Sequence, residues 1–137
     1  MNEPIKVSVV MCTYNGEKYL REQLDSIINQ TYPIHEIIIQ DDCSTDGTWE
    51  IIQEYATRNN NFRIYRNEIN LSVYHNFFSA FQKVTGEYFA VSDQDDFWLP
   101  DKIKIFVEYA EKSNALLFYS DSIIADTELN SRPLKSP

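Results

Sequence analysis

The sequence is poor in basic residues and in cysteine. Lysine and arginine together number 12 against 21 aspartates and glutamates, which gives a formal net charge of −9. Binding to nucleic-acid backbones needs clustered positive charge, so this balance argues against a nucleic-acid partner. The two cysteines, Cys12 and Cys43, do not make a disulfide framework. We therefore expect reduced thiols in a cytoplasmic protein.

Long apolar runs are also missing. No stretch approaches the roughly 20 apolar residues that span a bilayer, and the start, Met-Asn-Glu-Pro, lacks the pattern of a signal peptide. With 43% hydrophobic and 24% charged residues in a length of 137, we expect one globular domain with a respectable core. The pattern predicts that this domain covers residues 1–126 and that residues 127–137 form a polar tail.

Strand and helix patterns alternate along the chain. Apolar runs of strand length predict strands over residues 7–11, 37–39, 62–65, 88–91 and 116–119, and the run at 88–91 reads as a buried strand. Apolar residues at helical spacing lie between them, and Pro100 is expected at the start of the last helix. This alternation predicts an α/β fold with a mostly parallel sheet and helices on both faces.

Polar clusters follow three of the expected strands. They are Cys12-Thr-Tyr-Asn-Gly16, Asp41-Asp-Cys-Ser-Thr-Asp-Gly47, and Asp93 to Asp96. Ligands of open α/β sheets bind beyond the carboxyl ends of the strands, so we expect all three clusters at one edge. There Tyr14 is suited to stacking on a nucleotide base, and Asp42 to accepting a hydrogen bond from a base N–H.

The most informative segment is Val91-Ser-Asp-Gln-Asp-Asp-Phe-Trp-Leu-Pro100. Its carboxylates at 93, 95 and 96 follow an apolar run, and such a cluster is unfavourable unless positive charge lies against it. Mg²⁺ or Mn²⁺, often shared with phosphate oxygens, is the usual partner. The alternative is a solvated acidic turn that caps the following helix. An acidic protein that binds a phosphate ester needs a cation between the two, which favours the metal.

Four motifs run in order through residues 6–121. They read Val7-Ser-Val-Val-Met-Cys-Thr-Tyr-Asn15, Leu24-Asp-Ser-Ile-Ile-Asn-Gln-Thr-Tyr32, Ile37-Ile-Ile-Gln-Asp-Asp-Cys-Ser-Thr-Asp-Gly-Thr48 and Gly86-Glu-Tyr-Phe-Ala-Val-Ser-Asp-Gln-Asp-Asp-Phe-Trp-Leu-Pro-Asp-Lys102. Together they resemble the inverting family 2 glycosyltransferases of the GT-A fold. The resemblance implies a Rossmann-like nucleotide-binding half and metal-assisted transfer of a sugar, with inversion, from a nucleotide-diphosphate donor to a glycan or lipid-linked acceptor.

The resemblance also implies residue roles. The nucleotide-sugar pocket would be lined by Cys12, Thr13, Tyr14, Asn15, Asp42 and Asp93. Asp93-Gln94-Asp95 matches the family's DxD element, in which Asp95 would coordinate Mg²⁺ or Mn²⁺ and Asp93 would hold the ribose or assist the metal. The last motif is similar to those of bacterial enzymes that build cell-surface polysaccharides from UDP- or dTDP-linked sugars. A lipid-linked acceptor would bring a cytoplasmic enzyme to the inner face of the membrane.

Three positions depart from the family pattern. Cys12 stands where proline is usual, and Cys43 and Ser72 stand where glycine is usual. The sequence leaves open whether the backbone keeps a positive φ at Cys43. Family members are longer, and no motif here marks the acceptor site or the catalytic base. We therefore expect the donor-binding portion of a longer enzyme, poorly active alone and prone to self-association through exposed apolar surface.

Two other functions are compatible with some of these features. A receiver domain of two-component signalling is also a small acidic α/β protein that binds Mg²⁺ through aspartates. It would need an acidic pair after the first strand and an aspartate after the middle strand, where Cys12-Thr-Tyr-Asn15 and Tyr65-Arg-Asn67 stand. The second is a non-catalytic nucleotide-sugar-binding fragment of the same fold, which would bind the donor without transferring its sugar.

Overall fold

A computed structural model describes residues 3–130 and shows four strands alternating with four helices. In chain order the elements are β1 (Val7–Thr13), α1 (Glu17–Ile28), β2 (Glu36–Asp41), α2 (Thr48–Arg58), β3 (Phe62–Arg66), α3 (Ser72–Phe81), β4 (Tyr88–Ser92) and α4 (Lys102–Lys112). The predicted alternation is confirmed for these eight elements.

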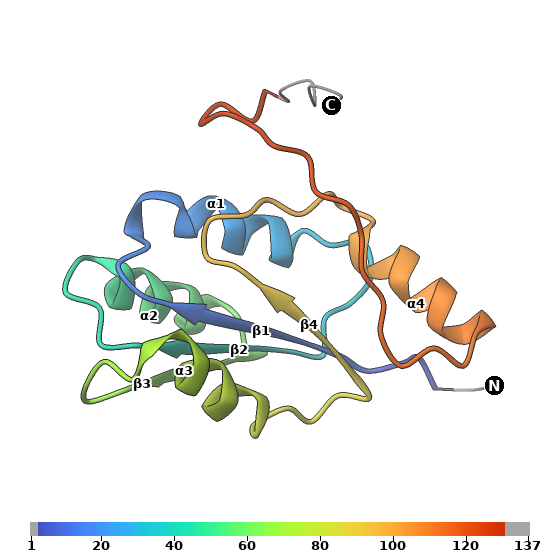
Figure 1. Ribbon diagram of the computed structural model, residues 1–137, viewed down its shortest axis with the longest axis horizontal. Coiled ribbons are helices and arrows are strands. Elements are labelled where there is room, and N and C mark those ends of the chain that lie inside the picture. Colours follow the sequence, from blue (N-terminus) through green and yellow to red (C-terminus); the bar gives the residue numbers. More distant parts are fainter. Residues whose placement is uncertain (1–2, 131–137) are drawn as a thin grey trace.

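The four strands form one parallel sheet in the order β3-β2-β1-β4. Val9 of β1 pairs with Ile37 of β2 on one side and with Ala90 of β4 on the other. Helices α1 and α2 lie on one face and α3 lies on the opposite face (Figure 1). The predicted α/β class, with a parallel sheet between helices, is therefore confirmed.

The central strands owe their burial to this layered arrangement. Every residue of β2 is buried, and in β1 only Cys12 is partly exposed. Strands covered on both faces have no solvent side, which explains why both read as nearly continuous apolar runs. In α1, Leu20, Leu24 and Ile27 recur at helical spacing and are fully buried against the sheet.

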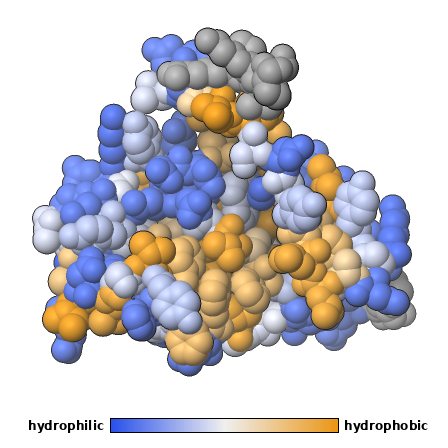
Figure 2. All heavy atoms as spheres, in the orientation of Figure 1, coloured by the Kyte–Doolittle hydropathy of each residue, from blue (hydrophilic) through white to orange (hydrophobic). Residues whose placement is uncertain are grey.

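The expectation that β4 is a buried strand is wrong for one of its two faces. Phe89 and Val91 are 49% and 48% exposed, while Ala90 packs against the main core. The reason is that β4 is an edge strand, and α3 packs mainly over β1 and β2. The Phe89 ring contacts Phe81 of α3 at 5.1 Å between centroids. Figure 2 shows apolar side chains gathered on this side of the molecule.

The predicted strand over residues 116–119 is also wrong. These residues form no ladder, and Leu116 is 93% exposed. A strand needs hydrogen bonds from a neighbour, and this segment pairs with no strand in the described part of the chain; only the ring of Phe118 packs, against Tyr88 and Phe106. An apolar run signals a tendency to be buried, but it does not supply a pairing partner.

The segment after α4 extends past α1 in Figure 1 without forming a further helix or strand up to residue 130. Residues 131–137 of the predicted tail lie outside the described residues, and the domain boundary at residue 126 stays a prediction. Between residues 3 and 130, none of the helices has both the length and the hydrophobicity needed to cross a membrane.

A buried carboxylate joins the strands at the amino edge of the sheet. Glu36 is 5% exposed and accepts hydrogen bonds from Ser8 Oγ at 2.7 Å, Thr85 N at 2.7 Å and Arg63 Nη1 at 2.7 Å. Burial by itself opposes ionisation of Glu36, but the hydrogen bonds from Arg63, Ser8 and Thr85 outweigh it and lower its pKa to about 2. The charged form of Glu36 therefore stabilises the fold.

We predict that Glu36→Gln lowers the free energy of unfolding at pH 7 by about 2 kcal/mol, because it weakens a buried charged hydrogen-bond network. The pKa of Glu36 is lowered on folding, so its contribution is present above about pH 4.5 and is lost as the pH falls towards 2. Urea unfolding of both proteins across this range should show the difference between them shrinking.

The matched control is Glu54→Gln. Glu54 lies in α2 and forms solvent-accessible ion pairs with Arg21 and Arg58. Solvent screens that pair, so the control should change stability much less. A Glu36→Gln protein as stable as the control at pH 7 would contradict the assigned role.

Candidate functional site at the carboxyl edge of the sheet

The loops that follow β1 and β4 are held together by one amide side chain. Gln94 Nε2 donates to the carbonyl of Tyr14 at 3.0 Å, and Tyr14 N donates to Gln94 Oε1 at 2.9 Å. A Cβ on Gly16 would meet the amide of Gln94, so a side chain at this position would push Gln94 out of the contact. The middle residue of the Asp93-Gln94-Asp95 element therefore docks the acidic turn onto the first loop.

The loop after β1 is held to the loop after β2 by three further bonds. Asn15 N donates to Ser44 Oγ at 3.0 Å, Thr45 N donates to Asn15 Oδ1 at 2.8 Å, and Gly16 N donates to Thr48 Oγ1 at 2.8 Å. Together with the Gln94 contacts, these bonds confirm that the three polar clusters gather at one edge of the sheet. The Asn15 side-chain oxygen therefore accepts a hydrogen bond from within the protein. The Asn15 backbone adopts a positive φ of 47°.

Asp41, the last residue of β2, anchors the loop that follows it. It is fully buried and accepts hydrogen bonds from Thr13 Oγ1 at 2.8 Å and Ser44 N at 3.0 Å. The Nε of Arg66 lies 3.5 Å from its Oδ2, and Arg66 Nη2 donates to the Ser44 carbonyl at 2.8 Å. The Thr13 hydroxyl donates its only proton to Asp41, so it has no proton left to donate to a ligand.

Asp42 differs from Asp41 in having one carboxylate oxygen to spare. Oδ1 accepts hydrogen bonds from Asn67 Nδ2 at 2.8 Å and from Leu71 N at 2.7 Å. Oδ2 has no hydrogen-bond partner among residues 3–130, yet no buried side-chain polar atom of that range lacks a partner, so Oδ2 reaches the surface. Although Asp42 as a whole is only 3% exposed, it presents one acceptor atom to an incoming molecule.

The flanking side chains of β1 and its loop take different positions. Tyr14 is 48% exposed, so its ring is available for stacking. Cys12 points towards the α3 face, where burial first, and then the charge of Asp42, raise its pKa to about 12. Its thiol is therefore neutral at physiological pH.

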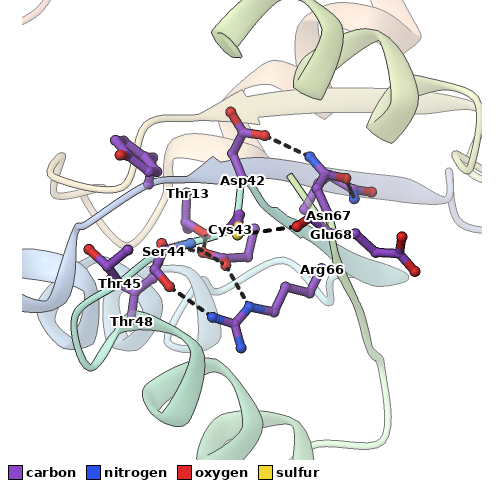
Figure 3. Close-up of polar contacts among 12 residues, drawn as sticks. Thr13, Asp42, Cys43, Ser44, Thr45, Thr48, Arg66, Asn67 and Glu68 are labelled. Carbon is purple, nitrogen blue, oxygen red and sulfur yellow. Dashed lines mark hydrogen bonds and ion pairs between the residues drawn. The ribbon is translucent and has the colours of Figure 1, made fainter. Parts of the chain in front are cut away.

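Two non-glycine residues adopt the left-handed backbone at positions where the sequence departs from the family pattern. Cys43 has a φ of 63° and Ser72 a φ of 69°. The question left open by the sequence is thus answered: the positive φ is kept at Cys43, at a cost of about 1 kcal/mol. The Cys43 thiol contacts the Glu68 carbonyl at 3.6 Å, which links the loops after β2 and β3 (Figure 3).

The acidic turn after β4 is exposed to solvent. None of the ion pairs within residues 3–130 involves Asp93, Asp95 or Asp96. Partial burial, and after it the charges of the other two aspartates, raise the pKa of Asp96, whereas Lys102 opposes this. These carboxylates therefore lie close enough together to repel one another.

A metal at this turn would need ligands from another molecule. Within the described residues, no cluster of three or more histidine, cysteine or acidic side chains is arranged to hold a metal ion. Mg²⁺ is commonly bound through only one or two carboxylates, with substrate phosphates and waters completing its coordination. The exposed oxygens of Asp93 and Asp95 fit that kind of site, and they fit a metal site made by the protein alone poorly.

The turn itself is anchored to α1 by side chains that sequence reasoning missed. Gln23 Nε2 donates to Ser92 Oγ at 2.6 Å, and Trp98 N donates to Ser26 Oγ at 3.1 Å. Gln30 Nε2 donates to the Leu99 carbonyl at 2.8 Å. The sequence did contain a signal for these contacts: polar residues such as Gln23 and Ser26 fall on the apolar face of the helix pattern. Buried polar groups require hydrogen-bond partners, so such residues indicate a contact with another segment.

Comparison with known proteins gives a consistent family. The family model described as glycosyl transferase family 2 matches residues 8–136. An uncharacterized glycosyltransferase of Haemophilus influenzae is 39% identical over 108 residues, which is 79% of this chain and 33% of that protein. TuaG of Bacillus subtilis, a putative teichuronic acid biosynthesis glycosyltransferase, is 35% identical over 120 residues, 87% of this chain and 48% of that protein. The chain thus spans a third to a half of the length of these relatives.

Solved structures resemble the same region. The S. aureus TarS fragment in complex with UDP-GlcNAc matches with a TM-score of 0.72 and 32% identity, over 79% of this chain and 32% of that one. The mannosyltransferase PcManGT of Pyrobaculum calidifontis, in complex with GDP-Man and Mn²⁺, matches with a TM-score of 0.63 and 27% identity, over 70% and 29%. These matches confirm the GT-A-like fold expected from the sequence.

We predict that Cys43→Gly raises the free energy of unfolding by about 0.5–1 kcal/mol, because glycine adopts the left-handed backbone without strain. Cys43→Ala is the matched control: it removes the thiol contact with Glu68 but keeps the strained φ, so it should give no gain. Urea denaturation of the three proteins measures the effect. An equal gain in both variants would mean that the thiol, rather than the backbone, is unfavourable.

Proposed function

The chain belongs to glycosyl transferase family 2, and from this premise we propose that its described residues form the donor site of a nucleotide-sugar glycosyltransferase. One observation carries the proposal. The loops after β1, β2 and β4 are hydrogen-bonded into a single edge that presents a stacking ring, a free carboxylate oxygen and an acidic turn that forms no ion pair within residues 3–130. The ring and the carboxylate oxygen suit the base of a donor, and the acidic turn suits its metal-bound diphosphate.

The base is proposed to bind between Tyr14 and Asp42. A carboxylate only accepts hydrogen bonds, so Oδ2 of Asp42 selects bases whose ring nitrogen carries a proton. Uracil and thymine have such an N3–H and guanine has an N1–H, whereas cytosine and adenine present a lone pair at that ring position and can donate only from the neighbouring exocyclic amino group. The UDP-GlcNAc complex of TarS supports a UDP-linked donor. A dTDP-linked donor satisfies the same chemistry.

The diphosphate is proposed to lie over the acidic turn. Asp95, assisted by Asp93, would hold Mg²⁺ or Mn²⁺, and the Mn²⁺ in the GDP-Man complex of PcManGT supports that choice. The bound cation would stabilise the negative charge of the leaving nucleoside diphosphate. Transfer with inversion also needs a general base for the acceptor hydroxyl, and we assign that role to no residue between 3 and 130.

The acceptor is proposed to be a growing glycan or a lipid-linked precursor of one. The support is the similarity to TuaG, whose name assigns it to teichuronic acid biosynthesis. A lipid-linked acceptor would place the reaction at the inner face of the membrane, with the donor supplied from the cytoplasm.

Self-association is also proposed, through the surface formed by Phe89 and Val91. Its support is the exposure of these two apolar side chains.

A non-catalytic donor-binding role is the second candidate, because the chain spans only a third to a half of its relatives. The two candidates share the site and differ in chemistry: only an enzyme releases nucleoside diphosphate from the sugar. A receiver domain gains no support, because the loop after β1 contains no acidic residue before Glu17 and β3 is followed by Asn67.

We predict that calorimetric titration in Mn²⁺ shows binding of UDP, dTDP or GDP and roughly tenfold weaker binding of CDP and ADP, because Asp42 cannot donate to their ring nitrogens. Chelation of the metal, or Asp95→Ala, should weaken binding by roughly tenfold or more. Asp126→Ala, in the exposed turn near residue 130, is the matched control and should bind as the original chain does. Equal affinity for all five nucleoside diphosphates, unchanged by chelation of the metal, would contradict the proposed site.

A further inference from the structure

We propose that Asn76 is a positioning residue of the base site, which acts through Asn67 to fix the free oxygen of Asp42 and so sets base selectivity. This inference rests on the proposed function of Asp42. Asn76 lies in α3, is 2% exposed and therefore has no access to a ligand. Its influence on the site has to pass through its two hydrogen-bonded neighbours.

The orientation of the Asn76 amide is fixed by the backbone. Asn76 Nδ2 donates to the Gln40 carbonyl at 2.9 Å, and a carbonyl can only accept. Oδ1 of Asn76 must then face the other way, where it accepts from Asn67 Nδ2 at 2.7 Å. Asn76 thereby dictates that Asn67 presents its NH₂ group and not its oxygen.

A second contact, through the side chain of Gln40, supports the same orientation of Asn67. Lys83 Nζ, a donor only, binds Gln40 Oε1 at 3.0 Å, so Gln40 Nε2 points to Asn67 Oδ1 at 2.7 Å. Lys83 is itself held by Ser79 Oγ and the Ser79 carbonyl, each at 2.9 Å. With its oxygen facing Gln40, Asn67 again has only its NH₂ group to offer to Asp42.

These contacts determine which oxygen of Asp42 is free. Asn67 Nδ2 has two protons, one for Asn76 Oδ1 and one for Asp42 Oδ1. Leu71 N binds the same Oδ1, so the carboxylate is held by one oxygen and Oδ2 is directed outwards. Both supports are needed to hold Asn67: with either one missing, Asn67 can turn its oxygen towards the base and the carboxylate can rotate, which would relax the requirement for a base N–H.

The test compares UDP, CDP and base-free pyrophosphate, each with Mn²⁺, by calorimetry on Asn76→Ala. We expect UDP binding to weaken roughly tenfold, CDP binding to change little and the UDP-to-CDP preference to fall accordingly. Pyrophosphate binding should be unchanged, because Asn76 does not act on the acidic turn. Asn59→Ala is the matched control, since Asn59 also donates to a backbone carbonyl, that of Tyr55 at 2.8 Å, at the end of α2.

Lys83→Met provides a second variant that leaves the buried Asn76 in place, so the test survives if Asn76→Ala does not fold. It removes the support of the Gln40 side chain and should reduce the UDP-to-CDP preference in the same direction with pyrophosphate binding retained. A preference equal to that of the original chain in the folded variants would overturn the inference, even if their melting temperatures fall. Equal binding of UDP and CDP by the original chain would instead overturn the proposed role of Asp42.

Discussion

Two carboxylates at the carboxyl end of β2 impose the arrangement on which the site depends. Asp41 is fully buried and Asp42 nearly so, and a buried carboxylate is tolerated only when hydrogen bonds satisfy it. Asp41 draws the β1 end, the following turn and Arg66 together, whereas Asp42 draws in Asn67 and the start of α3. The hydrogen bonds of these two adjacent carboxylates fix the geometry of this edge. Both oxygens of Asp41 have partners, whereas Asp42 is bound through Oδ1 and leaves Oδ2 without one among the described residues.

The sheet thus has a carboxylate at each edge with a different consequence. At the amino edge Glu36 is completely enclosed by donors from β1, β3 and the loop before β4, which stabilises the charged form and the strand pairing. At the carboxyl edge the exposed aspartates after β4 form no ion pair within residues 3–130, so no such pair there stabilises the fold. The acidic turn and the Asp42 oxygen lie beyond the carboxyl ends of the strands, which is where open α/β sheets bind their ligands.

Much of the fold was readable from the sequence, because β1 and β2 are buried on both faces and the helices between them keep one apolar side. The polar clusters were also placed at the correct edge, since the carboxyl ends of parallel strands coincide. The exposed face of β4 and the missing strand at 116–119 were not readable, because both depend on neighbours in space. Nor could the sequence show that Asn76 reaches Asn67, or that Cys43 keeps a glycine-like backbone, since amide orientation and φ are set by tertiary contacts.

A crystal structure of the protein with UDP and Mn²⁺ would locate the base, the diphosphate and the metal in one experiment. We expect the uracil N3–H on Asp42 Oδ2, the uracil ring against Tyr14, and the metal between Asp95 and the diphosphate oxygens. A nucleotide bound away from the loops after β1, β2 and β4, or a base whose ring nitrogen does not contact Asp42, would contradict the proposed site.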